Sequence, residues 1–156
     1  MSFVKAKDYI EKWNFGDRVM EFSVSSATVK DAAVAVGSSE AEIAKTLSFM
    51  VLDQPILIVM AGDQKIDNSK YKSMFHTKAK MLSFEDVEKV IGHQVGGVCP
   101  FGINEGVLVY LDISLKRFDF VYPACGSGNS AVKLTIEELE KISNFECWID
   151  VCKSIE

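Results

Sequence analysis

The sequence predicts an α+β (mixed α/β) fold in one domain spanning residues 1–156, with helices flanking a mixed sheet. Two apolar, β-rich runs, LSFMVLD and PILIVMAG, are joined around Asp53, Gln54 and Pro55, which indicates a hairpin that is buried on both faces. Further strand-like and helical segments mix along the chain without one βαβ unit repeating. The length and the 48% hydrophobic content are sufficient for one core.

Apolar periodicity and capping signals place the other elements. Gly37 is the stop signal of one helix. Ser39 followed by Glu42, and Thr135 followed by Glu138, have the spacing of helix-starting capping boxes. The expected elements, in chain order, are a helix over 3–14, a strand over 19–24, a helix over 28–36, a short helix from 39, the hairpin, a lysine-rich helical segment over 65–80, a helix over 83–90, strands over 106–112 and 117–123, a helix over 135–141 and a strand over 145–151.

Composition excludes several classes of function. No run reaches the roughly 18 to 20 uncharged apolar residues of a membrane span, and the N-terminus lacks the pattern of a signal peptide, so a cytoplasmic protein is expected. The net charge of -5 argues against a general nucleic-acid binder. The four cysteines form no CxxC pair, so neither a metal site nor a disulfide framework is expected, and no cofactor is predicted.

Basic residues nevertheless gather in one segment. Between residues 65 and 80 the chain carries five lysines and His76, against Asp67 as the one acidic residue. Such a run is usually a solvated helix face, and the alternative is a local surface for phosphate groups. The five lysines are Lys65, Lys70, Lys72, Lys78 and Lys80.

Two glycine-rich loops, GGVCPFG over 96–102 and GSG over 126–128, are candidate binding elements. Backbone N–H groups of such loops can converge on an anion or on a developing oxyanion. Neither loop matches a Walker or dinucleotide-binding pattern. Taken singly, each is explained as well by an ordinary turn.

Lys45 lies where a short helix leads into the central hairpin, in an otherwise apolar or small stretch. A lysine there either extends to water or serves an anionic ligand in a cleft, where desolvation would lower its pKa. A second candidate is Cys99, which His93 could approach as a base, so a Cys-His hydrolase stays open.

Four segments, in this order, resemble the YbaK family of prolyl-tRNA editing domains. They are IAKTLSF, GGVCPFG, VYLD followed by SLKRFD, and ACGSGNSAVKLTIEEL, and together the likeness covers roughly residues 20 to 145. The resemblance implies a curved, mostly antiparallel mixed sheet flanked by helices. It also implies hydrolysis of the ester that joins a wrong amino acid to tRNA, most often tRNA for proline, by free-standing proteins or by domains of prolyl-tRNA synthetase.

The resemblance further implies roles for individual residues. Lys45 matches the family's nearly constant charged residue and would anchor the terminal phosphate or ribose, while a role as general base stays open. Gly102 would act with it in catalysis. Backbone N–H groups of both loops would hold the oxyanion without a side-chain nucleophile. Phe101 would be a wall for the RNA end, and the lysines of residues 65–80 would contact the acceptor stem. The implied substrate-binding residues are Gly97, Val98, Cys99, Pro100, Phe101, Ala124, Cys125, Gly126, Ser127 and Gly128.

The preferred amino acid stays open. Some members of the family carry a polar side chain at the start of the last loop, where this chain has Ala124 and Cys125. Alanine, cysteine, serine, threonine and 2-aminobutyrate all fit a small, weakly polar pocket. The expected partners are aminoacylated tRNA and a synthetase. The alternatives are a non-catalytic aminoacyl-tRNA or nucleotide-binding module and a structural interaction domain.

Overall fold

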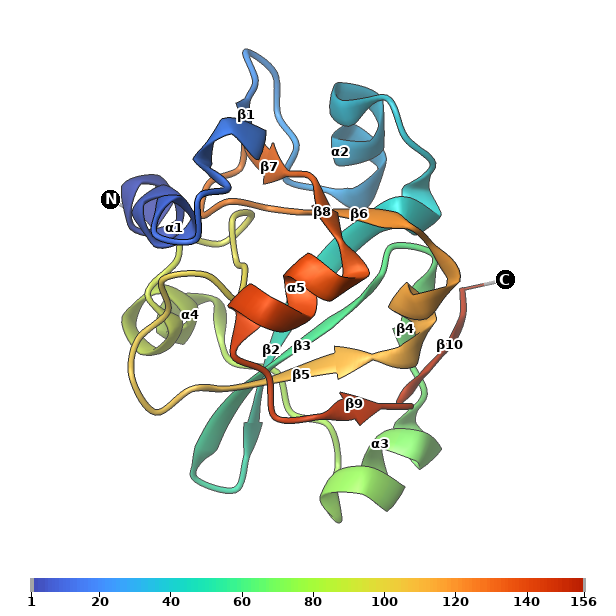
Figure 1. Cartoon of the computed structure of the whole chain (residues 1–156). Coiled ribbons are helices and arrows are strands. Elements are labelled where there is room, and N and C mark those ends of the chain that lie inside the picture. Colours follow the sequence, from blue (N-terminus) through green and yellow to red (C-terminus); the bar gives the residue numbers. More distant parts are fainter. Residues whose placement is uncertain (1, 156) are drawn as a thin grey trace.

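The computed structural model describes residues 2–155 and is organised around a six-stranded sheet with the strand order β8-β6-β2-β3-β5-β9 (Figure 1). Its centre is the antiparallel hairpin of β2 (Ile43–Val51) and β3 (Gln54–Ala61). Strand β5 (Leu108–Asp112) pairs parallel to β3, and β6 (Phe120–Pro123) pairs parallel to β2. The apolar hairpin predicted from the sequence is therefore confirmed as the middle of the sheet.

Short strands complete this sheet and form two smaller ones. Strand β1 pairs antiparallel with β7 and β4 with β10, while β8 and β9 are the edges of the six-stranded sheet. Of the seven ladders between these named strands, four are antiparallel and three parallel, which confirms a mixed sheet. The bounds are Val19–Glu21 (β1), Gln64–Ile66 (β4), Ser130–Val132 (β7), Leu134–Thr135 (β8), Trp148–Ile149 (β9) and Cys152–Ser154 (β10).

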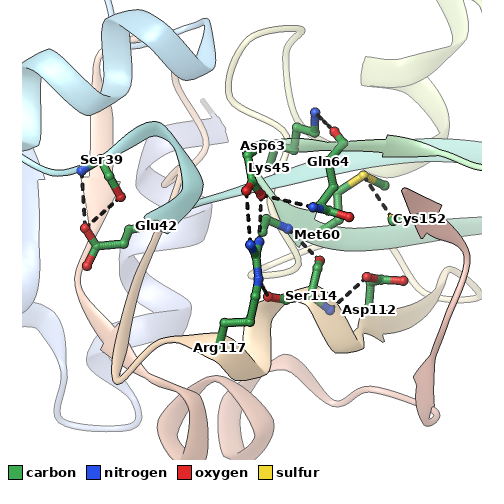
Figure 2. Close-up of polar contacts among 11 residues, drawn as sticks. Ser39, Glu42, Lys45, Met60, Asp63, Gln64, Asp112, Ser114, Arg117 and Cys152 are labelled. Carbon is green, nitrogen blue, oxygen red and sulfur yellow. Dashed lines mark hydrogen bonds and ion pairs between the residues drawn. The ribbon is translucent and has the colours of Figure 1, made fainter. Parts of the chain in front are cut away.

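The helices begin and end largely where local signals predict. Both capping boxes are present, Ser39 with Glu42 (Figure 2) and Thr135 with Glu138. Gly37 ends its helix in the left-handed region, at a φ of 77° that favours glycine. The α-helices are Ser2–Glu11 (α1), Val29–Val36 (α2), Asn68–Phe75 (α3), Phe84–Ile91 (α4) and Ile136–Ser143 (α5), and the 3-10 turns are Gly16–Arg18 (η1), Glu40–Glu42 (η2) and Ile113–Arg117 (η3).

The lysine-rich segment is the main departure from the predicted elements. Only residues 68–75 are helical, because Asp67 caps the start of α3 and His76 ends it in the left-handed region. Lys65 lies before the helix, in β4, and Lys78 and Lys80 lie after it. Small strands such as β4 and β10 were not predicted, since three residues carry too little periodicity to be recognised alone.

Alternate residues of β3 pack into two different hydrophobic clusters, because successive side chains of a strand point to opposite faces. Val59 packs in one cluster with Ile10 of α1 and Leu139 of α5. Ile58 packs in the other with Tyr71 of α3. The sheet is thus covered on both faces, which explains why the hairpin is a nearly continuous apolar run.

We expect Asp112→Ala to lower the free energy of unfolding by about 2–4 kcal/mol, because the variant leaves one buried and one partly buried N–H group without an acceptor. The Asp112 side chain is 1% exposed and accepts hydrogen bonds from the amides of Ser114 and Val151, at 2.9 Å each. These bonds tie the end of β5 to η3 and to the C-terminal segment. Urea unfolding measures the loss, with Asp119→Ala as the exposed control. Equal stability of the two variants would contradict this role.

Candidate active site

A cavity of about 390 Å³ lies along one edge of β2. Residues 43–48 of this strand line it, together with the first turns of α2 and α4 and with parts of the segments 95–98 and 122–124. Most of these side chains are apolar or small. The volume is in the range of pockets that hold a small ligand.

The edge of β2 that faces this cavity is paired only at its two ends. Residues 43–44 pair with β6, and farther along, Met50 donates to the carbonyl of Lys80 at 2.8 Å and Ser48 accepts from the amide of Leu82 at 3.2 Å. No named strand pairs with residues 45–47 on this edge within the described range 2–155. The cavity therefore lies over a gap in the sheet.

Thr46 presents polar groups to this gap. In an antiparallel pair, residues two apart direct their N–H and C=O groups to the same edge, so Thr46 directs its own to the edge that Ser48 and Met50 use. Its hydroxyl oxygen is also buried and has no hydrogen-bond partner in the described chain. A buried hydroxyl without a partner is costly unless a ligand or water satisfies it. Thr46 is therefore a candidate ligand-binding residue that the sequence analysis missed.

Lys45 borders the same cavity and is half-buried. It is paired across the sheet with Met60, and its Nζ donates a hydrogen bond to the carbonyl oxygen of Gln64 (Figure 2). Burial lowers the pKa of Lys45, and the nearby Cys152 and Asp63 oppose this shift.

The nearest carboxylate in the hydrogen-bond network around Lys45 already belongs to an ion pair. Arg117 binds Asp63 through both terminal nitrogens, at 2.6 and 3.0 Å, and this pairing lowers the pKa of Asp63 (Figure 2). Among residues 2–155 no carboxylate forms an ion pair with Lys45. The protonated side chain of Lys45 is thus bonded to a neutral carbonyl, and its positive charge can still attract an anion.

The two glycine-rich loops pack directly against each other. Gly97 is buried, and a Cβ atom there would lie closer to the backbone of Gly126 and Ser127 than non-bonded atoms approach. Gly96 and Val98 line the cavity, and within the described residues their amides have no hydrogen-bond acceptor. The close contact at Gly97 thus holds beside the cavity two residues whose amides have no acceptor among the described residues.

Of the predicted site residues, Lys45, Val98 and Ala124 line the cavity together. Phe101 of the 96–102 loop lies elsewhere: it is fully buried and stacks on Tyr9, with a centroid distance of 6.3 Å. Phe101 is therefore a core residue and not the expected wall, because its ring is part of the main hydrophobic cluster. The other predicted residues outside the cavity lining are Gly97, Cys99, Pro100, Gly102, Cys125, Gly126, Ser127 and Gly128.

Gly102 shapes the loop and does not border the cavity. Its φ of 66° is in the left-handed region, and a Cβ atom there would lie 2.7 Å from the carbonyl oxygen of Lys5. The residue therefore lets the loop dock against α1. A Gly102→Ala variant would disturb that docking as well as the loop, so its activity alone would not isolate a catalytic role.

The Cys-His arrangement is close in space but wrong for catalysis. Cys99 Sγ lies 3.5 Å from His93 Nε2, and both residues are fully buried. His93 Nε2 is also 2.5 Å from the carbonyl oxygen of Phe101, which can only accept, so Nε2 carries the proton and cannot receive one from the thiol. Burial raises the pKa of Cys99 and lowers that of His93. Cys99 is therefore a neutral core thiol.

The five lysines of residues 65–80 are all exposed, but their surroundings differ. Lys70 forms an ion pair with Asp150 at 3.0 Å and donates to the carbonyl of Cys152. Lys72 and Lys78 line a second cavity of about 390 Å³ together with the start of α3. The fold thus brings Lys72 and Lys78 together, and the charge of Lys70 is partly neutralised.

The residues that the structure describes include no helix long and apolar enough to cross a membrane. The same residues contain no group of three or more His, Cys, Asp or Glu side chains that could hold a metal ion.

The fold and the cavity define a class of protein: residues 24–142 match the family of aminoacyl-tRNA editing domains, and the chain belongs to this family. A crystal structure of a proposed trans-editing enzyme for prolyl-tRNA synthetase superposes with a TM-score of 0.87 at 27% identity, covering 98% of both chains. The crystal structure of the hypothetical protein APE2540, with a TM-score of 0.84 at 24% identity over 96% of this chain and 99% of that one, shares the fold. The expected curved, mixed sheet is thereby confirmed.

Among curated proteins, "Uncharacterized protein YwhH" of Bacillus subtilis (strain 168) is 52% identical over the full length of both chains. The proline–tRNA ligase of the same organism is 32% identical over 80 residues, which are 51% of this chain and 14% of the ligase. Family membership thus supports aminoacyl-tRNA deacylation in general and a relation to prolyl-tRNA synthetase.

We expect a thiol reagent such as Ellman's reagent to label one of the four cysteines in the native protein and all four after denaturation. Cys147 is exposed, whereas the other three are buried, and burial raises the pKa of each, that of Cys125 to about 12. A Cys147→Ser variant should show almost no native labelling. Rapid labelling of Cys99 in that variant would contradict the assignment of a neutral core thiol.

Proposed function

We propose that this protein hydrolyses the ester bond of mischarged aminoacyl-tRNA, with tRNA for proline that carries a small wrong amino acid as its substrate. The observation that carries the proposal is the gap in the edge of β2. There, polar groups of Thr46 that have no partner among residues 2–155 meet a small cavity in a chain of the aminoacyl-tRNA editing family. The reaction would take place in the cytoplasm, in association with a synthetase or after release of the charged tRNA.

The chemistry requires no side-chain nucleophile, because an aminoacyl ester is already activated. A water oxygen attacks the carbonyl carbon, the bond from that carbon to the ribose oxygen breaks, and a proton passes from the water to the leaving ribose oxygen. What the protein must supply is position and donors for the oxyanion. We assign this role to the amides of Gly96 and Val98 and to the polar groups of Thr46, since all three residues line the cavity.

The lining of the cavity favours a small amino acid. Ala32, Val98 and Ala124 are small apolar walls, while Ser48 and Ser130 add buried hydroxyl groups. Alanine, cysteine, serine, threonine and 2-aminobutyrate would all fit beside the terminal ribose. A synthetase pocket rejects such competitors weakly, since one methylene changes binding by only about 1–3 kcal/mol, and a second site that hydrolyses the error supplies the missing discrimination.

Lys45 would anchor the substrate through its positive charge. Its ammonium group is held by the carbonyl of Gln64 and by no carboxylate of the described chain, so a phosphate or ribose oxygen of the RNA end can bind it without breaking an ion pair. The other four proposed contacts, Lys65, Lys72, Lys78 and Lys80, would attract the acceptor stem, whereas Lys70 would first have to leave Asp150. In this proposal the glycines of both loops, Gly102 included, act through the shape of the backbone.

We expect the protein to clear at least one of alanine, cysteine, serine, threonine and 2-aminobutyrate from tRNA for proline, while it spares correctly charged proline. Lys45→Ala should lower kcat/KM about 100-fold, the scale of losing one group that stabilises developing charge. Release of radiolabelled amino acid measures both, with Lys12→Ala as the control at an exposed lysine. If no charged species is cleared, the non-catalytic binding module replaces this proposal, and near-normal turnover by Lys45→Ala would remove Lys45 from the site.

We expect Thr46→Val to separate stability from activity. The variant removes a buried hydroxyl that has no partner among the described residues, so the free energy of unfolding should stay equal or rise by about 1 kcal/mol. If that hydroxyl contacts the substrate, deacylation should fall about tenfold at the same time. Thr46→Ser keeps the hydroxyl and should retain most of the activity. A stable Val variant with wild-type kinetics would show that the hydroxyl does not bind the substrate.

A further inference from the structure

Three large apolar side chains are exposed where the cavity opens. Met81, Phe84 and Val95 are 55%, 77% and 45% exposed, and all three line the cavity. Single exposed apolar residues are common, but a group of them around one opening marks a binding surface. This group, hereafter the rim, contains one aromatic ring, that of Phe84.

The fold does not need the ring of Phe84. Phe84 is the first residue of α4, after Ser83, whose hydroxyl accepts from the amide of Asp86 at 3.2 Å. The buried face of this helix is formed instead by Val87 and Ile91. Within the described chain, Phe84 belongs to no hydrophobic cluster and makes no ring contact. The ring is therefore available to a ligand.

Charged residues flank Met81 and Phe84 along the chain and limit what that ligand can present to Phe84. Lys78 and Lys80 precede the rim along the chain, whereas Glu85 and Asp86 follow Phe84 directly in the first turn of α4. A phosphate beside these two carboxylates would be repelled, while one beside the lysines would be attracted. The group facing Phe84 should therefore be flat and uncharged and belong to a molecule whose phosphates lie toward the lysines.

We infer that Phe84 is a stacking platform for an unpaired nucleobase at the 3′ end of the RNA whose ester enters the cavity. The inference rests on the proposed function, because only an aminoacylated RNA places such a base next to the bond to be hydrolysed. Unpaired bases are commonly bound by stacking on exposed aromatic rings, since every base has an aromatic face. In this inference the exposed Phe84, and not the buried Phe101, supplies the aromatic wall for the RNA end.

The test measures, by fluorescence anisotropy, the binding of an RNA hairpin that carries no amino acid. The hairpin ends in a single-stranded ACCA and has a 5′ fluorophore. Phe84→Ala should weaken binding about tenfold, the scale of losing one stacked base. Phe84→Leu should bind as weakly as the Ala variant, and Phe84→Trp should restore the affinity. Val34→Ala is the matched control, because Val34 is also 77% exposed but does not line the cavity. A blunt hairpin without the 3′ single strand should bind all these variants equally.

Stacking also has a spectroscopic signature. The ACCA hairpin should quench the additional tryptophan fluorescence of the Phe84→Trp variant, and the blunt hairpin should not. Equal binding by Phe84→Ala and wild type, or full rescue by Phe84→Leu, would overturn the inference.

Failure of the proposed function is distinguishable from failure of the inference, since the hairpin carries no amino acid and its binding does not depend on hydrolysis. A protein that deacylates nothing but shows the aromatic-dependent binding retains the platform and loses the proposed activity. A protein that deacylates mischarged tRNA with the same KM in wild type and Phe84→Ala retains the activity and loses the platform.

Discussion

The pairing of β2 is the constraint on which the site depends. Along one edge this strand is bonded to β3 from Ala44 to Val51, and along the other the residues of the described range 2–155 hold it only near its ends. The strand is therefore fixed in place while its middle stays open. Polar groups held in this way need no reorganisation when a ligand arrives, which is the condition under which hydrogen-bond donors contribute most to catalysis. The cost is a buried hydroxyl on Thr46 that has no partner in the described part of the chain.

The close packing of the two glycine-rich loops holds part of the 96–102 loop beside the cavity. Gly97 lies against the backbone of residues 126–127, and its neighbours Gly96 and Val98 line the cavity. The side chains of Cys99 and Phe101 are buried in the core. The 96–102 loop thus contributes both to the cavity and to the hydrophobic core.

The elements that could be predicted are those with local signals. The apolar hairpin, the capping boxes at Ser39 and Thr135 and the lysine between helix and strand are all visible in short stretches of sequence. The gap in the edge of β2 is not local, since it depends on where β6 and residues 80–82 stop pairing. Nor does a loop's sequence tell which of its side chains are buried, and so Phe101 was placed in the cavity and Phe84 was overlooked.

In the proposed function, the distribution of charge would let an acidic chain bind the acceptor end of an RNA. The cavity and its rim are mainly apolar, and apart from Lys45 the candidate cations lie outside them, with Lys72 and Lys78 together at a second cavity. Attraction to phosphates by such separate lysines is sensitive to salt and indifferent to sequence, so it would orient the acceptor stem without choosing a substrate. Selection of the substrate would then depend on the small cavity and on contacts with its rim. Such contacts depend on shape and burial, and they persist when salt screens the lysines.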